Sequence, residues 1–204
     1  MSYQDETLDY YSENAEYLAA HYELADVFTL QQRLRESFLT GSDVLELGCG
    51  SGRDAAVFSE MEISLTATDG VPEMIDEAKI LHPELSTIFH TCLLPHQLKY
   101  DNDSFDGIYA AGVLMHLNDA DITQTLERCH SILKTQGRLL IVVSIERDDV
   151  ANGFDEYQRL FTLLSADEWQ QRCHKLGFKT ISCVRSGNAL EWKGITWLTL
   201  LLEK

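Results

Sequence analysis

The stretch V-L-E-L-G-C-G-S-G-R-D at Val44–Asp54 decides the fold. Its mostly apolar start is typical of a buried strand, and a G-x-G-x-G turn follows directly. Glycines at such a junction let the backbone take positive φ values and let a ligand approach the main chain closely. In an open α/β sheet, ligands bind at the carboxyl ends of the strands, where this turn would lie. The stretch therefore predicts a ligand-binding loop, with an ordinary tight turn as the alternative.

Two familiar nucleotide-binding motifs do not fit this turn. A P-loop requires G-K-S/T, which is absent, and the dinucleotide fingerprint G-x-G-x-x-G requires glycine or alanine where Arg53 stands. Asp69 ends the next predicted strand, about twenty residues past the first glycine, where an acid can accept hydrogen bonds from both ribose hydroxyls of an adenosine. Asp69 is equally placed to cap a helix beginning near Pro72, and it can serve both purposes.

The rest of the chain alternates helix and strand patterns, which favours an open α/β sheet. Strands are expected at Asp43–Leu47, Ile63–Thr68, Thr87–His90, Phe105–Ala110, Arg138–Ser144, Phe178–Val184 and Ile195–Leu202. Helices are expected over residues 8–22 and 30–39, after Gly52, from Pro72, after a cap at Asp119 or Asp121, and from the capping box Ser165–Glu168 to Gly177. The last two strands should form a hairpin, packed by Trp192 and Trp197. We predict a single Rossmann-like, doubly wound, seven-stranded sheet, mostly parallel with an antiparallel last strand and helices on both faces.

The charge balance excludes several partner classes. Lys and Arg total 16 against 33 Asp and Glu, so the formal net charge is −17, which disfavours nucleic acid and anionic membranes. The first 32 residues hold seven acids and no Lys or Arg, unlike a signal peptide, and the apolar runs are too short to span a bilayer. The five cysteines form no C-x-x-C pair and the seven histidines are dispersed. We expect a cytoplasmic monomer or homodimer without a metal site.

Four motifs together resemble the class I S-adenosylmethionine (SAM) dependent methyltransferases. They are E-L-G-C-G-S-G-R-D at Glu46–Asp54, T-D-G at Thr68–Gly70, S-F-D-G-I-Y at Ser104–Tyr109 and G-R-L-L-I-V at Gly137–Val142. Within that superfamily the chain is closest in motif to small stand-alone enzymes of the tellurite-resistance type. The resemblance implies a SAM-binding methyltransferase domain over residues 41–204, a helical cap or lid over residues 1–40, and methyl transfer to a small molecule by in-line displacement.

The resemblance also implies roles for individual residues. Glycines of the loop would face the methionine part of SAM, an acid below them would orient its amino group, and Asp69 would bind the ribose. The implied cofactor-binding residues are Tyr11 (in the lid), Glu46, Gly48, Cys49, Gly50, Gly52, Asp69, Gly70, Val71, Cys92, Leu93, Ala110 and Ala111. Cys92 stands where the family usually has Asp, so a backbone N–H of Leu93 would read the adenine instead.

His116 is the candidate catalytic residue, because it follows the fourth strand where the family faces its acceptor. A general base, a polar wall of the pocket and a structural histidine with one backbone hydrogen bond are the three interpretations. Arg147 and Arg159 flank the long connection after the fifth strand, where either would hold an acidic substrate or be paired on the surface. Two function classes stay open: a small-molecule methyltransferase, and a nonenzymatic SAM- or adenosine-binding domain. A nucleotide-sugar or NAD enzyme is disfavoured by Arg53.

Overall fold

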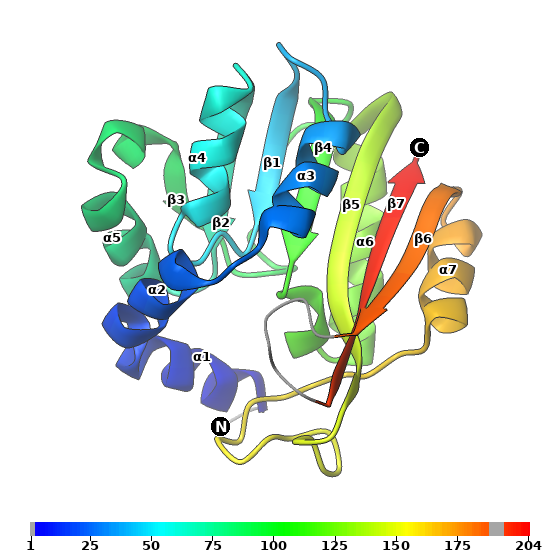
Figure 1. Ribbon diagram of the computed structural model, residues 1–204. Coiled ribbons are helices and arrows are strands. Elements are labelled where there is room, and N and C mark those ends of the chain that lie inside the picture. The colour runs from blue at the N-terminus through cyan, green and yellow to red at the C-terminus, as the bar shows by residue number, and fades with distance from the viewer. Residues whose placement is uncertain (1–2, 188–193) are drawn as a thin grey trace.

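The computed structural model describes residues 3–187 and 194–204 (Figure 1). One seven-stranded sheet has the order β3-β2-β1-β4-β5-β7-β6. The strands are β1 (Asp43–Leu47), β2 (Ser64–Asp69), β3 (Phe89–Thr91), β4 (Phe105–Ala111), β5 (Leu133–Arg147), β6 (Lys179–Gly187) and β7 (Ile195–Glu203). Pairing is parallel from β3 to β5, and β7 runs antiparallel to both β5 and β6. The predicted fold class is confirmed.

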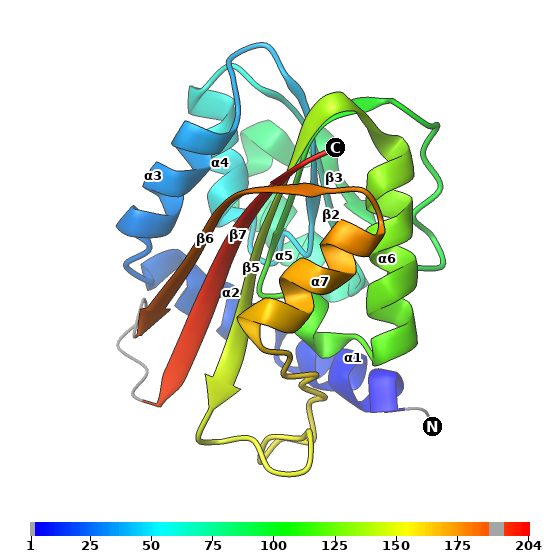
Figure 2. The ribbon, with the colours of Figure 1, turned by 90° about the vertical axis from the view of Figure 1, so that its right-hand side faces the viewer.

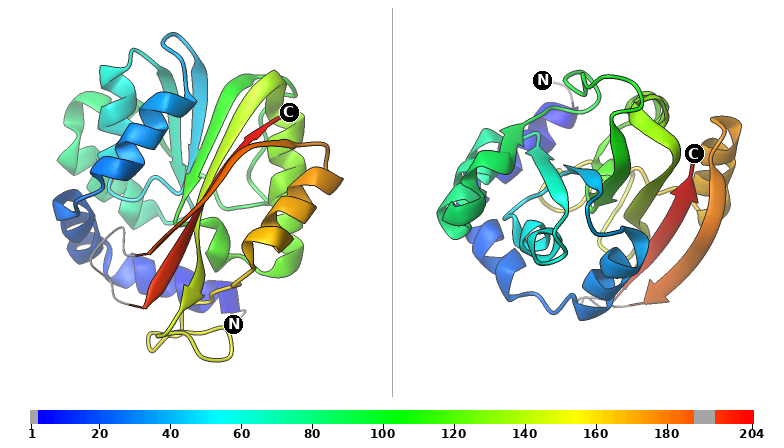
Figure 3. Two further views of the ribbon diagram at one scale, coloured as in Figure 1. Left: turned by 45° about the vertical axis from the view of Figure 1, so that its right-hand side comes forward. Right: turned by 90° about the horizontal axis from the view of Figure 1, so that it is seen from above.

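Helices cover both faces of the sheet. They are α1 (Tyr3–Glu13), α2 (Ala15–Leu24), α3 (Phe28–Ser37), α4 (Arg53–Glu60), α5 (Pro72–Leu81), α6 (Asp119–Ile132) and α7 (Ala166–Lys175), with short 3-10 turns η1 (Pro83–Ile88) and η2 (Leu114–His116). Helices α3 and α4 lie on one face, and α6 and α7 on the other (Figure 2). Helices α1 and α2 pass across the end of the sheet at which the arrowhead of β1 points (Figures 1 and 3).

Several predicted elements have different limits in the structure. The single N-terminal helix is two helices separated at Asn14, whose side-chain amide donates to the Tyr10 carbonyl at 2.8 Å. The cap of α6 is Asn118, which accepts from the Asp121 N–H, so neither Asp119 nor Asp121 caps the helix. Strand β3 begins later than expected because residues 83–88 form a 3-10 turn that starts at a proline.

Two local predictions about α7 are confirmed. The capping box of α7 forms between Ser165 and Glu168, and Gly177 follows the helix with a φ of +100°. Trp197 is buried on β7, whereas Trp192 lies outside the described residues. No helix in the described part of the chain has the length and apolar character needed to cross a membrane. Among the described residues, no three His, Cys, Asp or Glu side chains gather as a metal-binding group.

Candidate active site

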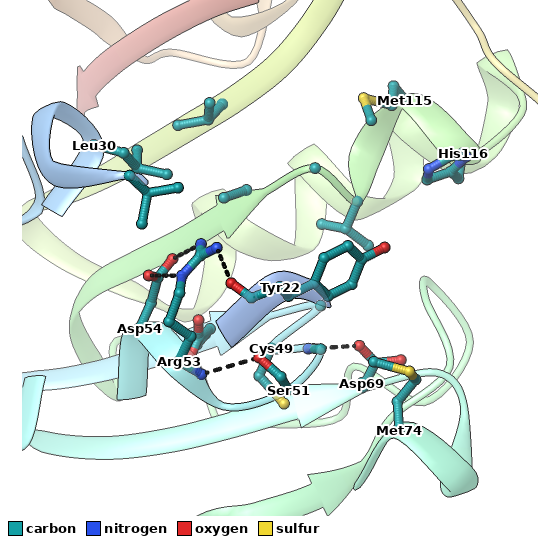
Figure 4. Close-up of a pocket in the computed structure, with 18 of the residues that line it drawn as sticks. Tyr22, Leu30, Cys49, Ser51, Arg53, Asp54, Asp69, Met74, Met115 and His116 are labelled. Atoms are coloured by element: carbon teal, nitrogen blue, oxygen red, sulfur yellow. Dashed lines mark hydrogen bonds and ion pairs between the residues drawn. The ribbon is translucent and has the colours of Figure 1, made fainter. Parts of the chain in front are cut away.

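A cavity of about 550 Å³ lies at the carboxyl ends of β1, β2 and β4 (Figure 4). Residues of α1 and α2 also line it. Its walls divide into two parts. The loop half contains Glu46, Gly48–Ser51, Asp69–Val71, Met74, Cys92 and Leu93. The acceptor half contains Val113, Met115, His116, Leu117, Arg159, Phe161 and six residues of β5, β6 and β7. The cavity is thus large enough for a nucleoside-sized ligand and a small molecule together.

Glycines shape the loop that follows β1. Gly48 and Gly50 have φ values of +73° and +55°, which side-chain-bearing residues rarely adopt. A Cβ added to Gly48 would stand 2.6 Å from the Cβ of Val113. The loop therefore needs glycine at position 48 both for its backbone conformation and for its packing.

Asp69 is fixed by the backbone of two loops. Its Oδ2 accepts from the N–H of Gly50 at 3.0 Å (Figure 4). Its Oδ1 accepts from the N–H of Val71, also at 3.0 Å. Burial raises the pKa of this carboxyl, while these backbone donors act in the opposite direction. Val71, and not Asp69, occupies the N-cap position of α5. Each carboxylate oxygen accepts more than one hydrogen bond, so Asp69 retains acceptor capacity toward the cavity.

Glu46 is a buried acid without a matching donor. It is 2% exposed, and its Oε2 accepts no hydrogen bond from any described residue. Burial, reinforced by the nearby charge of Asp54, raises the pKa of Glu46 well above its ordinary value. A buried, unpaired carboxyl is costly, so a cationic or N–H-bearing ligand would be stabilised beside it.

Arg53 joins the loop to α2. Its Nε donates to Asp54 at 2.9 Å and its Nη1 to the carbonyl of Tyr22 at 3.1 Å. Ser51 adds a second link, because its hydroxyl donates to Glu23 at 2.7 Å. Sequence analysis missed this α2 contribution, since no local pattern relates residues 22–23 to residues 51–53.

His116 is held at both ring nitrogens. Its Nδ1 lies 2.8 Å from the carbonyl oxygen of Leu160, which can only accept, so Nδ1 carries the proton. In the neutral ring Nε2 then accepts from the hydroxyl of Tyr11, at 3.1 Å. Burial lowers the pKa of His116 to about 4, and the charges of Arg159 and Arg147 act in the same direction. The imidazole is therefore neutral at physiological pH, and Tyr11 donates to its acceptor nitrogen.

Tyr11 connects α1 to the connection between β5 and α7. Its hydroxyl also accepts from Nη1 of Arg159 at 3.4 Å and lies within hydrogen-bonding contact of Tyr22. Arg159 in turn forms a salt bridge with the buried Asp155 at 2.6 Å. A further hydrogen bond joins α1 to this connection, from the N–H of Leu160 to the hydroxyl oxygen of Thr7 at 2.9 Å. These contacts hold α1 over the acceptor half.

Most of the residues implied by the sequence resemblance line the cavity. They are Tyr11, Glu46, Gly48, Cys49, Gly50, Asp69, Gly70, Val71, Cys92, Leu93, Ala111 and His116. Gly52 and Ala110 do not: a Cβ on Gly52 would meet Phe89 at 2.8 Å, and Ala110 is fully buried in the sheet. Burial raises the pKa of Cys92, which keeps its thiol neutral. The N–H of Leu93 donates to the side chain of Gln97 at 2.9 Å, so Gln97 competes for the adenine contact expected there.

Comparison with known proteins identifies the family of this chain. A family model described as "Methyltransferase domain" matches residues 17–183. An O-methyltransferase from Pyrenophora dematioidea is 29% identical over 162 residues, covering 74% of this chain and 59% of that protein. The chain therefore spans less than two thirds of the length of this curated relative.

Two solved structures are similar over nearly all of this chain. The 1,6-didemethyltoxoflavin-N1-methyltransferase of Burkholderia thailandensis, with bound 1,6-didemethyltoxoflavin and S-adenosylhomocysteine, has a TM-score of 0.78 at 20% identity, covering 99% of this chain and 88% of that one. Phosphoethanolamine N-methyltransferase 2 of Haemonchus contortus, in complex with phosphomonomethylethanolamine and S-adenosylhomocysteine, has a TM-score of 0.79 at 17% identity, covering 100% and 61%. At such identities these likenesses show the fold alone. The family match extends from α2 into β6 and includes the glycine loop and Asp69, and so this chain belongs to the methyltransferase-domain family.

Proposed function

We propose that the protein transfers a methyl group from SAM to a small-molecule acceptor. The observation that carries this proposal is the unpaired, buried carboxyl of Glu46 on the wall of the cavity, beside the glycine loop. The amino group of SAM is the kind of donor that this carboxyl lacks. Two further residues fit the same ligand. Gly48 lets the loop approach it closely, and the fixed carboxylate of Asp69 can accept from the ribose hydroxyls.

The residues of the loop half would hold the cofactor at its two ends. Glu46 would bind the amino group, Asp69 the ribose hydroxyls, and Val71 and Leu93 would flank the adenine. When bound, SAM supplies a methyl carbon activated by its cationic sulfur. Acids on this side of the cavity suit that positive charge, because opposite charges attract strongly at a partly buried site.

The acceptor half would align the acceptor and take up its proton. In-line displacement depends on alignment of the attacking atom, the methyl carbon and the sulfur, so positioning is the main task of the protein. Where the attacking atom carries a proton, Nε2 of His116 would accept it, directly or through the hydroxyl of Tyr11. We propose that residues 1–40 act as a lid that excludes water, since α1 is bonded to the segment around Leu160.

Calorimetry with SAM, S-adenosylhomocysteine and NAD tests the cofactor assignment. We expect wild-type protein to bind both sulfur nucleosides and not NAD, and Glu46→Gln to weaken binding by tenfold or more. Glu84→Gln is the matched control, because Glu84 is exposed and away from the cavity. Preference for NAD, or equal binding by the Glu46 variant, would contradict the proposal.

Turnover separates the enzyme from a nonenzymatic SAM-binding domain. Formation of S-adenosylhomocysteine should be measured against phenols, thiols, amines, small acids and oxidised chalcogen anions. The last class belongs in the panel because of the motif likeness to the tellurite-resistance type. Tight cofactor binding with no turnover across the panel would favour the binding domain.

A further inference from the structure

Arg147 stands on the wall of the cavity because of an extra residue in β5. Ser144 pairs with Trp197 and Glu146 pairs with Thr196, so two steps along β5 match one step along β7. Such a bulge changes which side chains share a face. Without the extra residue, Glu146 would take the place opposite Ile195 that Arg147 has. The bulge thus puts a cation on the cavity face, while Glu146 accepts from Thr196 and is exposed.

The guanidinium of Arg147 is buried but only partly paired. Its side chain is 4% exposed, and its Nε and Nη2 donate to the two oxygens of Asp149 at 2.9 and 2.6 Å. Its Cζ lies over the ring of Phe161, 4.3 Å from the ring centroid. Its Nη1 makes no hydrogen bond to any residue in the described part of the chain. A guanidinium whose side chain is largely buried and which keeps one donor group free is stabilised by an anion that reaches that group.

The strands around Arg147 form a wall of the cavity on which, among the described residues, Arg147 is the one charge. We call the cavity-lining residues of β5, β6 and β7 the sheet wall: Val142, Arg147, Val184, Ser186, Trp197 and Thr199. Register places Ser186 opposite Trp197 and Val184 opposite Thr199, so these side chains share one face. Arg147 is the one charged member of the sheet wall. The acids that line the cavity, Asp26, Glu46, Asp54 and Asp69, all belong to other segments.

From this arrangement we propose that the sheet wall is a binding subsite for the anionic group of a largely apolar methyl acceptor, with Nη1 of Arg147 as the principal donor. The hydroxyls of Ser186 and Thr199 are the secondary donors. The apolar body would lie against Trp197, Val184 and Phe161. This assignment rests on the proposed function, because it names the acceptor class of the same cavity.

The contacts of Arg159 and Phe161 show that their roles differ from the anion binding proposed for Arg147. Arg159 pairs with the buried Asp155 and donates its Nη1 to Tyr11, whereas Arg147 pairs with the half-exposed Asp149 and donates its Nη1 to no described residue. The ring of Phe161 contacts both groups, since its centroid lies 4.3 Å from Cζ of Arg147 and 4.5 Å from the imidazole centroid of His116. One small molecule can therefore place its anionic group at Arg147 and its reacting atom near His116.

Three ligands with one body and different charges test the subsite. 4-Hydroxyphenylacetate is anionic at pH 7.5, 4-hydroxyphenylacetamide is neutral and tyramine is cationic. Calorimetry on the complex with S-adenosylhomocysteine should give at least tenfold tighter binding of the acid than of the amide, and weakest binding of the amine. Arg147→Gln should remove the preference of acid over amide while leaving the affinity for S-adenosylhomocysteine unchanged.

Arg185→Gln is the matched control, since Arg185 is exposed on β6, one of the three strands of the sheet wall, but does not line the cavity. It should keep the wild-type preference. Failure of the wild type to distinguish acid from amide, or to bind any of the three, would overturn the subsite. If Arg147→Gln does not fold, the wild-type preference for the acid over the amide, and the same measurement on Arg147→Lys, still test the subsite. Failure of the wild type to bind S-adenosylhomocysteine would instead overturn the proposed function.

Discussion

His116 shows how burial changes the expected behaviour of a candidate base. At the ordinary imidazole pKa, a rate that depends on neutral His116 would fall on acidification near pH 6.5. In this structure burial lowers the pKa of His116 to about 4, so such a fall is expected only near that pH. A rate that falls near pH 6.5 must have another cause, such as titration of the acceptor.

The same shift makes stability depend on pH. The folded protein keeps His116 neutral down to about pH 4, whereas the unfolded chain binds a proton below about pH 6.5. The contribution is therefore fully present above pH 6.5 and is lost as the pH falls toward 4. Urea unfolding at pH 7 and pH 5 should show His116→Gln losing less stability than wild type, by about 2 kcal/mol. Equal losses in the two proteins would contradict a buried, neutral imidazole.

Asp69 is the second residue for which the structure gives a prediction. Asp69→Ala removes the acceptor expected for two ribose hydroxyls, each worth about 1.5–3 kcal/mol as a charge-assisted hydrogen bond. It also frees the N–H groups of Gly50 and Val71. Affinity for S-adenosylhomocysteine should fall by at least tenfold in calorimetry, with Asp76→Ala, on α5 and away from the cavity, as control. Undiminished affinity would rule out Asp69 as the ribose acceptor.

At the scale of elements, the turn between β1 and α4 depends on close packing against the segment after β4. Gly48→Ala places a Cβ 2.6 Å from Val113 at a positive φ, whereas Gly41→Ala has a similar φ of +80° and nothing within 4 Å. Both variants incur backbone strain, and Gly48→Ala adds an overlap that typically costs about 1–3 kcal/mol. Denaturant unfolding should therefore show Gly48→Ala as the less stable variant. Equal stabilities would mean that Val113 moves aside freely.

Elements were predictable where the signal is local. Strand β1 and the capping box of Ser165 have their expected limits, because a few adjacent residues determine each of them. The contact of Glu23 with Ser51 was not predictable, since it joins segments 28 residues apart without any shared periodicity. The face on which Arg147 lies depends on a bulge, and the bulge is defined by pairing with β7, a strand far away in the sequence. The glycine loop, Asp69, an N-terminal lid and Arg147 as a candidate substrate ligand were thus expected from sequence, but the contacts of α2 with the loop and the strands that surround Arg147 were not.

For the whole molecule, the net charge of −17 is the dominant property. Repulsion among so many acids destabilises a compact state, and salt screens it over about 10 Å at 0.1 M. We expect the melting temperature to rise by a few degrees between 20 and 500 mM NaCl. Thermal unfolding followed by circular dichroism at fixed pH checks this, with sucrose as an uncharged comparison. A fall with salt would mean that surface ion pairs such as Arg35–Glu60 outweigh the repulsion.

The reversed direction of β7 has a practical consequence for handling this protein. Because β7 runs against its neighbours, Lys204 lies at the end of the sheet opposite α1 and the cavity (Figure 1). Lys204 is anchored there, since its N–H donates to Gly137 and its carbonyl accepts from Gln136. An affinity tag, fluorophore or surface linker attached after Lys204 would leave the cavity mouth clear. The same attachment ahead of α1 would stand beside a helix that lines the cavity.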